Sequence, residues 1–135
     1  AMEDALLNIE LVEQPVSCRD YTGLKLVTRT VHTPILADES VFSTEDARRI
    51  LEEHAADMIN IKLMKTGGIH KALQICDLAD RYDVSCMAGC MLESAVSVSA
   101  AAHLAAARSC ISMCDLDGPS LCANLPVNWR EVISL

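Results

Sequence analysis

The sequence predicts an α/β fold of about five parallel strands joined by crossover helices. Short apolar runs alternate with longer segments whose apolar residues recur at the spacing of an amphipathic helix. This alternation is typical of parallel strands with helical crossovers. The strand-like runs are almost continuously apolar, as expected for a sheet covered on both faces or closed into a barrel. The expected strands are residues 8–13, 34–38, 58–63, 84–91 and 110–114.

Four helices are expected, one between each pair of consecutive strands. The first covers residues 21–30, after a short loop. The second runs over about 44–54, because Ser43 or Thr44 can cap it and acidic residues follow in its first turn, near the positive end of the helix dipole. A Gly-Gly pair precedes the third, and an alanine-rich segment forms the fourth. These last two helices are expected over about 69–82 and 94–108.

Composition limits the kind of protein. The chain has 135 residues, which suits one domain, and 51% of them are hydrophobic but only 3% aromatic, so the core must be aliphatic. The net charge of −8, with no block of Lys and Arg, argues against nucleic-acid binding. No apolar run reaches the roughly 18 residues of a membrane span. No signal peptide is visible at the N-terminus.

The seven cysteines are expected to be free thiols. Their number is odd and most lie in apolar segments, which favours buried thiols in the reducing cytoplasm over disulfides. Cys86 and Cys90 are separated by three residues, as are Cys110 and Cys114, and this spacing alone permits a zinc site. The runs lack turn residues between the cysteines, so zinc is the less favoured interpretation.

Charged side chains stand at the carboxyl ends of the expected strands. Glu13, Asp38 and Lys62 end the first three strands, with 25 residues from Glu13 to Asp38 and 24 from Asp38 to Lys62. These near-equal separations predict equivalent positions on three neighbouring strands. In parallel α/β folds the strand ends converge on one rim, where active sites are built. The alternative is that each is an ordinary polar residue at the end of a strand.

These residue types suggest a metal-assisted site. Carboxylates on adjacent strands suit a hard cation such as Mg²⁺, which prefers oxygen ligands and keeps several waters. A cation beside Lys62 would favour the neutral amine, which could then act as a base.

Four short motifs, in order along the chain, resemble the enolase superfamily. They fit its muconate-lactonizing subgroup and, through the D-x-D pattern, the dipeptide epimerases. The resemblance runs from about Asn8 to Pro119. The motifs are E-Q-P at 13–15, A-D-E-S at 37–40, N-I-K-L-M-K-T-G-G at 60–68 and D-L-D-G-P at 115–119.

The resemblance implies roles for five residues. Glu13 and Asp38 would be two of three Mg²⁺ ligands, and Lys62 would be one of two acid/base lysines that face each other across the α-carbon of a dipeptide. Asp115 and Asp117 would bind the α-ammonium group of that dipeptide. The implied reaction removes the proton next to a carbonyl group, with Mg²⁺ stabilising the developing charge, and returns a proton on the opposite face.

The chain carries only part of the family's pattern. A complete (β/α) barrel typically needs about 250 residues. Residues 1–119 are therefore expected to form the C-terminal portion of a partial TIM-type barrel, about its last five strands, and residues 120–135 a divergent tail. The other lysine, one metal ligand and the capping domain of the family are missing from the pattern. The isolated chain is expected to bind Mg²⁺ weakly and to show negligible epimerase activity.

Four other residues have open or lesser roles. Lys65 lies past its strand and is expected at the rim or surface. Glu93 either approaches the substrate or begins the following helix, and Met91 either lines the pocket or packs in the core. His103, in the alanine-rich helix, is expected to be a packing or surface residue.

Self-association is expected because five strands cannot close a barrel of eight. The first and fifth strands would be open edges, which invite pairing with another chain. A homo-oligomer would cover apolar residues that are otherwise exposed. Those expected to be uncovered are Ile9, Leu11, Ile35 and Ile59.

Three functions remain in view. The first is a dipeptide epimerase, and the second is a catalytically inactive barrel fragment that self-associates. The third is a Schiff-base aldolase that uses Lys62. Glu13 and Asp38 argue against the third, because Schiff-base chemistry needs no metal.

Overall fold

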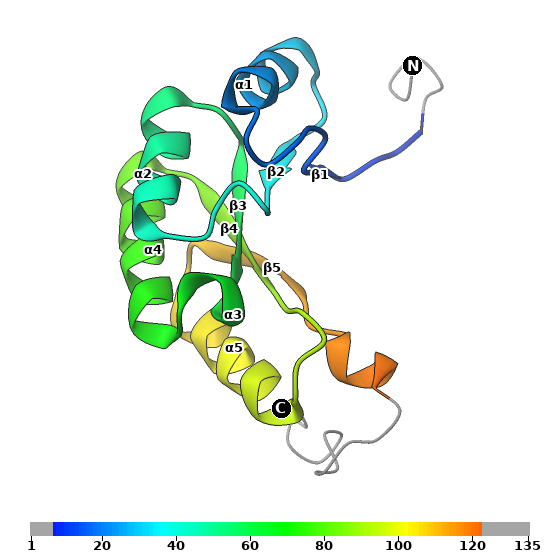
Figure 1. The fold of residues 1–135 in the computed structure, drawn as a ribbon, viewed down its shortest axis with the longest axis vertical. Helices are drawn as coiled ribbons and strands as arrows, with labels where there is room; N and C mark the ends of the chain where they lie inside the picture. Colours follow the sequence, from blue (N-terminus) through cyan, green and yellow to red (C-terminus); the bar gives the residue numbers. More distant parts are fainter. Residues whose placement is uncertain (1–6, 123–135) are drawn as a thin grey trace.

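The computed structural model describes residues 7–122, which form a five-stranded parallel sheet with helices in its crossovers (Figure 1). The strands are hydrogen-bonded in the order β1-β2-β3-β4-β5, so each pairs with its neighbour in sequence. The predicted α/β class with parallel strands is confirmed, and the arrangement is that of a partial barrel. The strands are β1 (Val12–Glu13), β2 (Ile35–Ala37), β3 (Met58–Lys62), β4 (Ser85–Gly89) and β5 (Ile111–Asp115).

The four predicted helices lie within a residue or two of their expected positions. Figure 1 shows them along the convex side of a curved sheet. Two short helices were not predicted, one directly after β3 and one after β5. No helix in the described part of the chain is long and apolar enough to cross a membrane. The helices are α1 (Tyr21–Thr30), α2 (Thr44–Glu53), α3 (Leu63–Thr66), α4 (Ile69–Tyr82), α5 (Ala95–Ala107) and a 3-10 helix (Gly118–Leu121). Residues 123–135 of the predicted tail lie outside the described residues.

The start of α2 follows from its capping sequence. The Ser43 hydroxyl accepts a hydrogen bond from the Asp46 backbone N–H at 3.1 Å, as an N-cap residue does. The Asp46 carboxylate in turn accepts the backbone N–H of Phe42 at 3.1 Å. These bonds fix the loop between β2 and α2, which begins at the rim of the sheet.

The Gly-Gly pair lets the chain reverse between α3 and α4. Gly67 ends α3 in the left-handed region at φ 82°, and Gly68 begins α4 at φ 106° and ψ −177°. A side chain strains the backbone in both conformations, and the second is essentially restricted to glycine. The turn therefore depends on two glycines at these positions.

Strand β1 is shorter than predicted, with two residues in place of 8–13. Its ladder with β2 starts where the Val12 N–H donates to the Pro34 carbonyl at 2.9 Å. Pro34 has no N–H to continue the ladder towards the N-terminus. Ile9 and Leu11 precede this pairing and are partly exposed.

The strand ends are staggered rather than level. Glu13 pairs with Leu36, and Leu36 pairs with Met58. Asp38 therefore lies two residues beyond the level of Glu13, and Lys62 lies two residues beyond the level of Asp38. The prediction of equivalent positions is wrong in register, but a shift of two residues keeps the side chains on one face. Such a stagger accompanies the tilt of strands in a barrel.

The core lies between the sheet and its helical layer. Ile35 and Ile59 are fully buried there with Ile50 of α2 and Ile75 of α4. The expectation that Ile35 and Ile59 are uncovered is wrong, because both side chains belong to this helix-facing core. The opposite face of the strands carries the polar residues of the rim.

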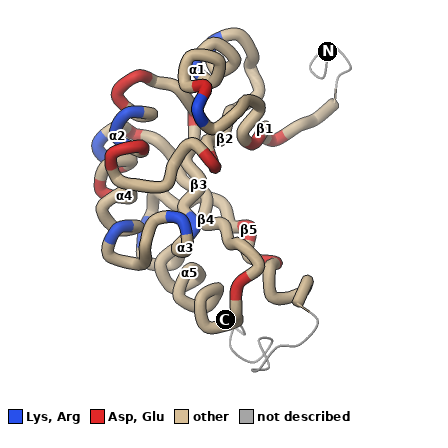
Figure 2. The backbone as a smooth tube through the Cα atoms, in the orientation of Figure 1, with Lys and Arg blue, Asp and Glu red and all other residues tan. Residues whose placement is uncertain are grey.

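Charged side chains of both signs are mixed on the helical layer. Figure 2 shows Lys and Arg interleaved with Asp and Glu along α2 and α4. On α2, Arg49 pairs with Glu53 at 3.1 Å and Arg48 with Glu45 at 3.5 Å. Such exposed pairs contribute about 0–1 kcal/mol each. Within the described residues, the buried charged groups lie instead beyond the ends of the strands, with Asp38 after β2, Lys62 and Lys65 at the end of β3, and Glu93 after β4.

Candidate active site

Lys62 and Asp38 form a buried ion pair at the carboxyl ends of β3 and β2. The Lys62 Nζ lies 2.6 Å from the Asp38 Oδ2, and the two side chains are 14% and 5% exposed. Burial would raise the pKa of Asp38, but hydrogen bonds from two lysines outweigh it and hold that pKa below its usual value. Burial likewise lowers the pKa of Lys62 less than Asp38 raises it, so the pKa of Lys62 lies above its usual value. In the absence of a bound cation, Lys62 is thus held in its charged form.

The second lysine at this carboxylate is Lys65. Its ammonium group contacts the Asp38 Oδ1, and it donates to the Asp38 carbonyl at 2.6 Å and to the Asn60 carbonyl at 3.2 Å. Of its two expected places, Lys65 has the one at the rim, but its side chain is only 4% exposed, so the expectation of a surface residue is wrong. The reason is α3, whose single turn directs Lys65 back over the end of β3. Burial lowers the pKa of Lys65, more than its contact with Asp38 raises it.

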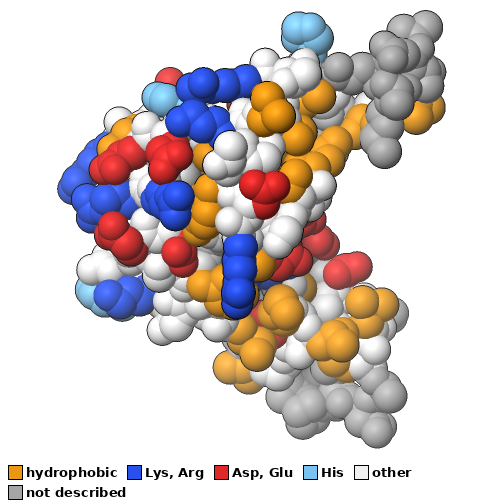
Figure 3. All heavy atoms as spheres, turned by 45° about the horizontal axis from the view of Figure 1, so that its top comes forward, with side chains coloured by type: hydrophobic (Ala, Val, Ile, Leu, Met, Phe, Trp, Pro, Cys, Tyr) orange, Lys and Arg blue, Asp and Glu red, His pale blue; other side chains and the backbone are white. Residues whose placement is uncertain are grey.

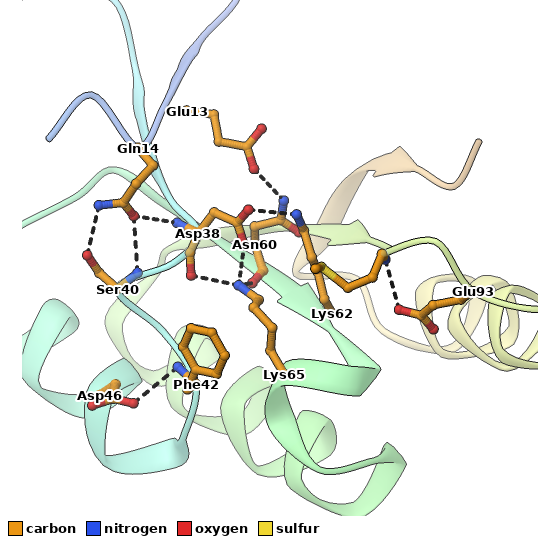
Figure 4. A network of polar contacts seen from close by, with 11 residues as sticks. Glu13, Gln14, Asp38, Ser40, Phe42, Asp46, Asn60, Lys62, Lys65 and Glu93 are labelled. Carbon is orange, nitrogen blue, oxygen red and sulfur yellow. Dashed lines mark hydrogen bonds and ion pairs between the residues drawn. The ribbon is translucent and has the colours of Figure 1, made fainter. Parts of the chain in front are cut away.

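Glu13 joins this network through Asn60. The Asn60 Nδ2 donates to the Glu13 Oε1 at 2.8 Å, across the end of β2 (Figure 4). Partial burial raises the pKa of Glu13, and the neighbouring Asp38 carboxylate raises it further. A carboxylate whose charge is disfavoured by a neighbouring carboxylate is a suitable donor for a cation. The predicted pair of metal ligands, Glu13 and Asp38, is therefore brought together by the fold.

The donor set fits two ligands of a hard divalent cation. Within residues 7–122, no three side chains from Asp, Glu, His and Cys are grouped to hold a metal ion. Glu13 and Asp38 would therefore leave the other coordination positions to water or to donors beyond the described chain. Mg²⁺ accepts this arrangement, because it commonly keeps several waters.

Gln14 is a site residue that the sequence argument did not single out. Its Oε1 accepts the backbone N–H groups of Asp38 at 3.0 Å and of Ser40 at 3.2 Å, and its Nε2 donates to the Ser40 Oγ at 2.9 Å. Gln14 also has a positive φ of 41°. It thus ties the end of β1 to the loop that begins at Asp38. The only indication in the sequence was its place in the E-Q-P motif.

Asp115 and Asp117 lie on the same rim but apart from the lysine cluster. Asp115 ends β5, and the pairings of Lys62 with Gly89 and of Gly89 with Asp115 put it level with Lys62, two strands away. Two strand spacings correspond to about 10 Å between backbones. Both aspartates are exposed. The space between them and Lys62 is of a size that a small substrate can bridge.

The loop that carries Asp117 is packed against the end of β4. The Gly118 N–H donates to the Cys90 Sγ at 3.4 Å, and a Cβ at Gly118 would lie 2.4 Å from the Met91 carbonyl oxygen. Glycine is thus needed here for close approach. Cys90 contacts this loop, and all seven cysteines are free thiols.

Glu93 is buried just before α5 and contacts both the preceding turn and the first turn of that helix. It is 5% exposed, its Oε1 accepts the Met91 N–H at 2.9 Å, and its Oε2 contacts the Ser97 hydroxyl in the first turn of α5. Of its two predicted roles, the geometry favours the start of the helix. His103 is exposed and its ring contacts the Ser99 carbonyl at 2.7 Å, as expected for a surface residue.

A cavity of about 280 Å³ opens beside the two lysines. Phe42, Met64 and Met91 form its apolar wall and are each about half exposed or more. Of its two predicted roles, Met91 has the pocket-lining one. Figure 3 shows hydrophobic side chains next to charged ones on the hollowed side of the molecule. The cavity is lined by Asp38, Glu39, Phe42, Lys62, Met64, Lys65 and Met91.

Comparison with known proteins identifies relatives of this chain. The chain is 61% identical to the L-Ala-D/L-Glu epimerase of Clostridium acetobutylicum over 122 residues. This match covers 90% of this chain and 34% of that protein. Its fold matches the substrate-liganded L-Ala-D/L-Glu epimerase of Bacillus subtilis with a TM-score of 0.89 and 50% identity, over 91% of this chain and 34% of that one.

A third relative was solved with both ligands of interest. The dipeptide epimerase of Enterococcus faecalis, in complex with Mg and the dipeptide L-Leu-L-Tyr, matches with a TM-score of 0.88 and 48% identity, over 93% of this chain and 35% of that one. The chain spans about a third of the length of the relatives it matches. The resemblance to the dipeptide epimerases is therefore confirmed for the C-terminal part of their barrel. A family model of the enolase C-terminal domain-like proteins matches residues 1–128, and the chain belongs to that family.

Proposed function

We propose that this chain supplies one side of the active site of a Mg²⁺-dependent dipeptide epimerase. The observation that carries the proposal is the single network at the carboxyl rim of the sheet, in which Lys62 contacts Asp38, and Asp38 is linked through Lys65 and Asn60 to Glu13. The family of the chain and the epimerases among its relatives support it. Since the chain spans about a third of those relatives, the activity is proposed for a complete site to which this chain contributes.

Lys62 is the proposed acid/base residue. Its Nζ would take the proton from the α-carbon of the dipeptide and return a proton to it. Glu13 and Asp38 would hold Mg²⁺, which when bound withdraws electron density from the carbonyl next to that carbon and favours the neutral amine of Lys62. Mg²⁺ would thus compete with the ammonium groups of Lys62 and Lys65 for Asp38.

Asp115 and Asp117 are the proposed ligands of the α-ammonium group of the substrate. Both are exposed on the rim, so they are accessible to a cation. Their separation from Lys62 by two strands leaves room for a dipeptide whose α-carbon lies over Lys62. The apolar wall of the cavity would contact the substrate's hydrocarbon part.

Inversion of the α-carbon needs a second acid on the face opposite Lys62. Lys62 and Lys65 both come from the end of β3, and among the described residues neither lies across the substrate from the other. We expect the isolated chain to exchange the α-proton slowly, through Lys62 alone, without inverting the centre. Ordinary enzymes turn over on the order of 10 s⁻¹, and we expect a rate far below this.

Proton NMR of L-Ala-L-Glu in D₂O with Mg²⁺ tests the proposal. The α-proton signal should decline in the presence of the chain, and Lys62→Ala should abolish this decline. Lys71→Ala is the matched control, because Lys71 is exposed on α4, outside the network. Equal exchange with the chain and with Lys62→Ala would overturn the assignment of the base.

Mg²⁺ binding provides an independent test of the ligands. Isothermal titration should detect weak binding by the chain, which Glu13→Gln combined with Asp38→Asn removes. Sub-micromolar affinity, or affinity unchanged in the double variant, would contradict the ligand assignment.

A catalytically inactive, self-associating chain is the second candidate. What favours it is the position of β1 and β5 as the outer strands of the described sheet, with unpaired backbone groups. We also propose a cytoplasmic location, since seven free thiols suit a reducing compartment. The Schiff-base hypothesis finds no support among the epimerase relatives, and borohydride trapping with a carbonyl substrate would test it directly.

A further inference from the structure

Asn60 is one of the few polar side chains in the described chain that are completely removed from solvent. It is 1% exposed and lies on the inner face of β3, two residues before Lys62. Its Nδ2 donates to the Glu13 Oε1 at 2.8 Å. Its Oδ1 is buried without a hydrogen-bond partner among the described residues. An amide that is only half satisfied costs folding free energy, so packing alone does not account for Asn60 at this position.

The neighbouring strand leaves space for this amide. A Cβ at Gly89 of β4 would lie 2.4 Å from the Asn60 Oδ1 and 2.9 Å from its Nδ2. Gly89 is not among the glycines with positive φ, so its backbone conformation is open to other residues. What requires glycine here is the volume occupied by the Asn60 amide.

Glu13 depends on this amide for its orientation. Glu13 is exposed at the end of the short edge strand β1, and its one described side-chain hydrogen bond comes from Asn60. The Asp38 carboxylate beside it disfavours a second negative charge at this place. Without the Asn60 donor, the Glu13 side chain would be free to turn into solvent, away from Asp38.

The main chain of Asn60, on β3, is linked to Asp38 through Lys65. The Asn60 carbonyl accepts from the Lys65 Nζ at 3.2 Å, and Lys65 contacts the Asp38 carboxylate. Asn60 is therefore linked to both carboxylates, to one through its side chain and to the other through its main chain (Figure 4).

We propose that Asn60 is a positioning residue that fixes the Glu13 carboxylate beside Asp38, and that Gly89 provides the space this requires. The consequence for Mg²⁺ binding rests on the proposed function, whereas the contact between Asn60 and Glu13 does not. Positioning groups behind metal ligands typically change metal affinity by about 10- to 100-fold when removed. The proposed role belongs to the Asn60 side chain, which donates to Glu13, whereas the link to Asp38 through Lys65 uses only the Asn60 main chain.

Nitrogen-15 NMR of the chain without metal gives the first readout. The side-chain amide signals of Asn60 are assigned by their loss in Asn60→Ala. They should shift in Glu13→Gln, where a charged acceptor becomes a neutral one, and stay in place in the control Glu10→Gln, which changes an exposed carboxylate on the same segment. Unshifted Asn60 signals in Glu13→Gln would overturn the proposal.

Mg²⁺ affinity gives the second readout. Asn60→Ala should weaken binding by about tenfold, and it should weaken it no further when Glu13→Gln is already present. Equal losses from Asn60→Ala with and without Glu13→Gln would show independent effects and overturn positioning through Glu13. If the unaltered chain binds no Mg²⁺, the metal assignment fails, while the amide signals still decide whether Asn60 holds Glu13.

Substitution of Gly89 distinguishes an effect on the position of the Asn60 amide from an effect on folding. Gly89→Ala removes no polar group, yet it should displace the Asn60 amide and weaken Mg²⁺ binding in the same way. Adding Asn60→Ala to Gly89→Ala should restore the unfolding midpoint, because the new methyl group then occupies vacated space, but it should not restore the affinity. Restored affinity in this double variant, or unchanged affinity in Gly89→Ala, would contradict the assigned role of the amide.

Discussion

Replacing Asp38 by Asn removes the one anion that Lys62 and Lys65 both contact. The side chains of the two lysines are 14% and 4% exposed, so neither charge is well solvated when its partner is lost. Breaking a buried ion pair by removing one partner typically costs about 3–5 kcal/mol. Lys62 is the more exposed lysine and has Glu13 nearby, which places the expected cost for Asp38→Asn near the lower end, at about 3 kcal/mol.

Urea unfolding followed by far-ultraviolet circular dichroism measures this cost. Glu53→Gln is the matched control, because Glu53 also stands between two cations, Arg49 at 3.1 Å and Lys25 at 3.8 Å, but its side chain is 41% exposed. The control is expected to lose about 1 kcal/mol or less. The difference between the two variants isolates the effect of burial.

A second variant shows whether the unpaired charges cause the loss. Asp38→Asn combined with Lys65→Met removes the anion and the more buried cation together, and it should recover about 2 kcal/mol relative to Asp38→Asn alone. The reasoning is refuted if Asp38→Asn costs no more than Glu53→Gln, or if the added Lys65→Met destabilises the chain further.

Three other outcomes are expected. The pKa of Asp38 is lower in the folded chain than in the unfolded chain, so its ionised form contributes stability that is fully present above about pH 4. This stability is lost as the pH falls through the pKa of Asp38 in the folded chain. Acid unfolding of the metal-free chain should therefore depend less on pH in Asp38→Asn. In urea unfolding, Gly68→Ala should cost about 1–3 kcal/mol, whereas Gly67→Ala should cost about 1 kcal/mol. The reason is that only Gly67 has the left-handed conformation that other residues tolerate. Equal costs would contradict this. Light scattering coupled to size exclusion should give a mass above the 14.6 kDa of one chain, and a concentration-independent peak at that mass would refute self-association.

The parallel sheet and its four crossover helices were predictable because each element has a local cause. Apolar runs of strand length, the cap at Ser43 and the Gly-Gly turn are all visible over a few residues. The exact pairing of the strands is not local. The spacing of Glu13, Asp38 and Lys62 suggested level positions, whereas tilted strands stagger them by two residues each.

The site was predictable to the extent that strand ends converge on one rim. This rule brought Glu13, Asp38 and Lys62 together, and the structure places them in one network. It could not find Asn60, because an asparagine inside an apolar strand has no distinguishing pattern until its neighbours across the sheet are known. The partner of Asn60 is 47 residues away in sequence, and the space it occupies is left by a glycine on a third strand.

Lys65 is where local reasoning failed most clearly. A lysine after the end of a strand is usually solvated, and nothing in L-M-K-T predicts a single helical turn between a strand and a Gly-Gly pair. That turn directs the Lys65 ammonium to Asp38, so a carboxylate that could bind a metal already has two cationic partners. Because Mg²⁺ would have to displace at least one of these contacts, the affinity of the site is set by the lysines as well as by the ligands. Lys65→Met should therefore strengthen Mg²⁺ binding by the chain, as measured by isothermal titration. Unchanged or weaker binding would show that Lys65 does not compete with Mg²⁺ for Asp38.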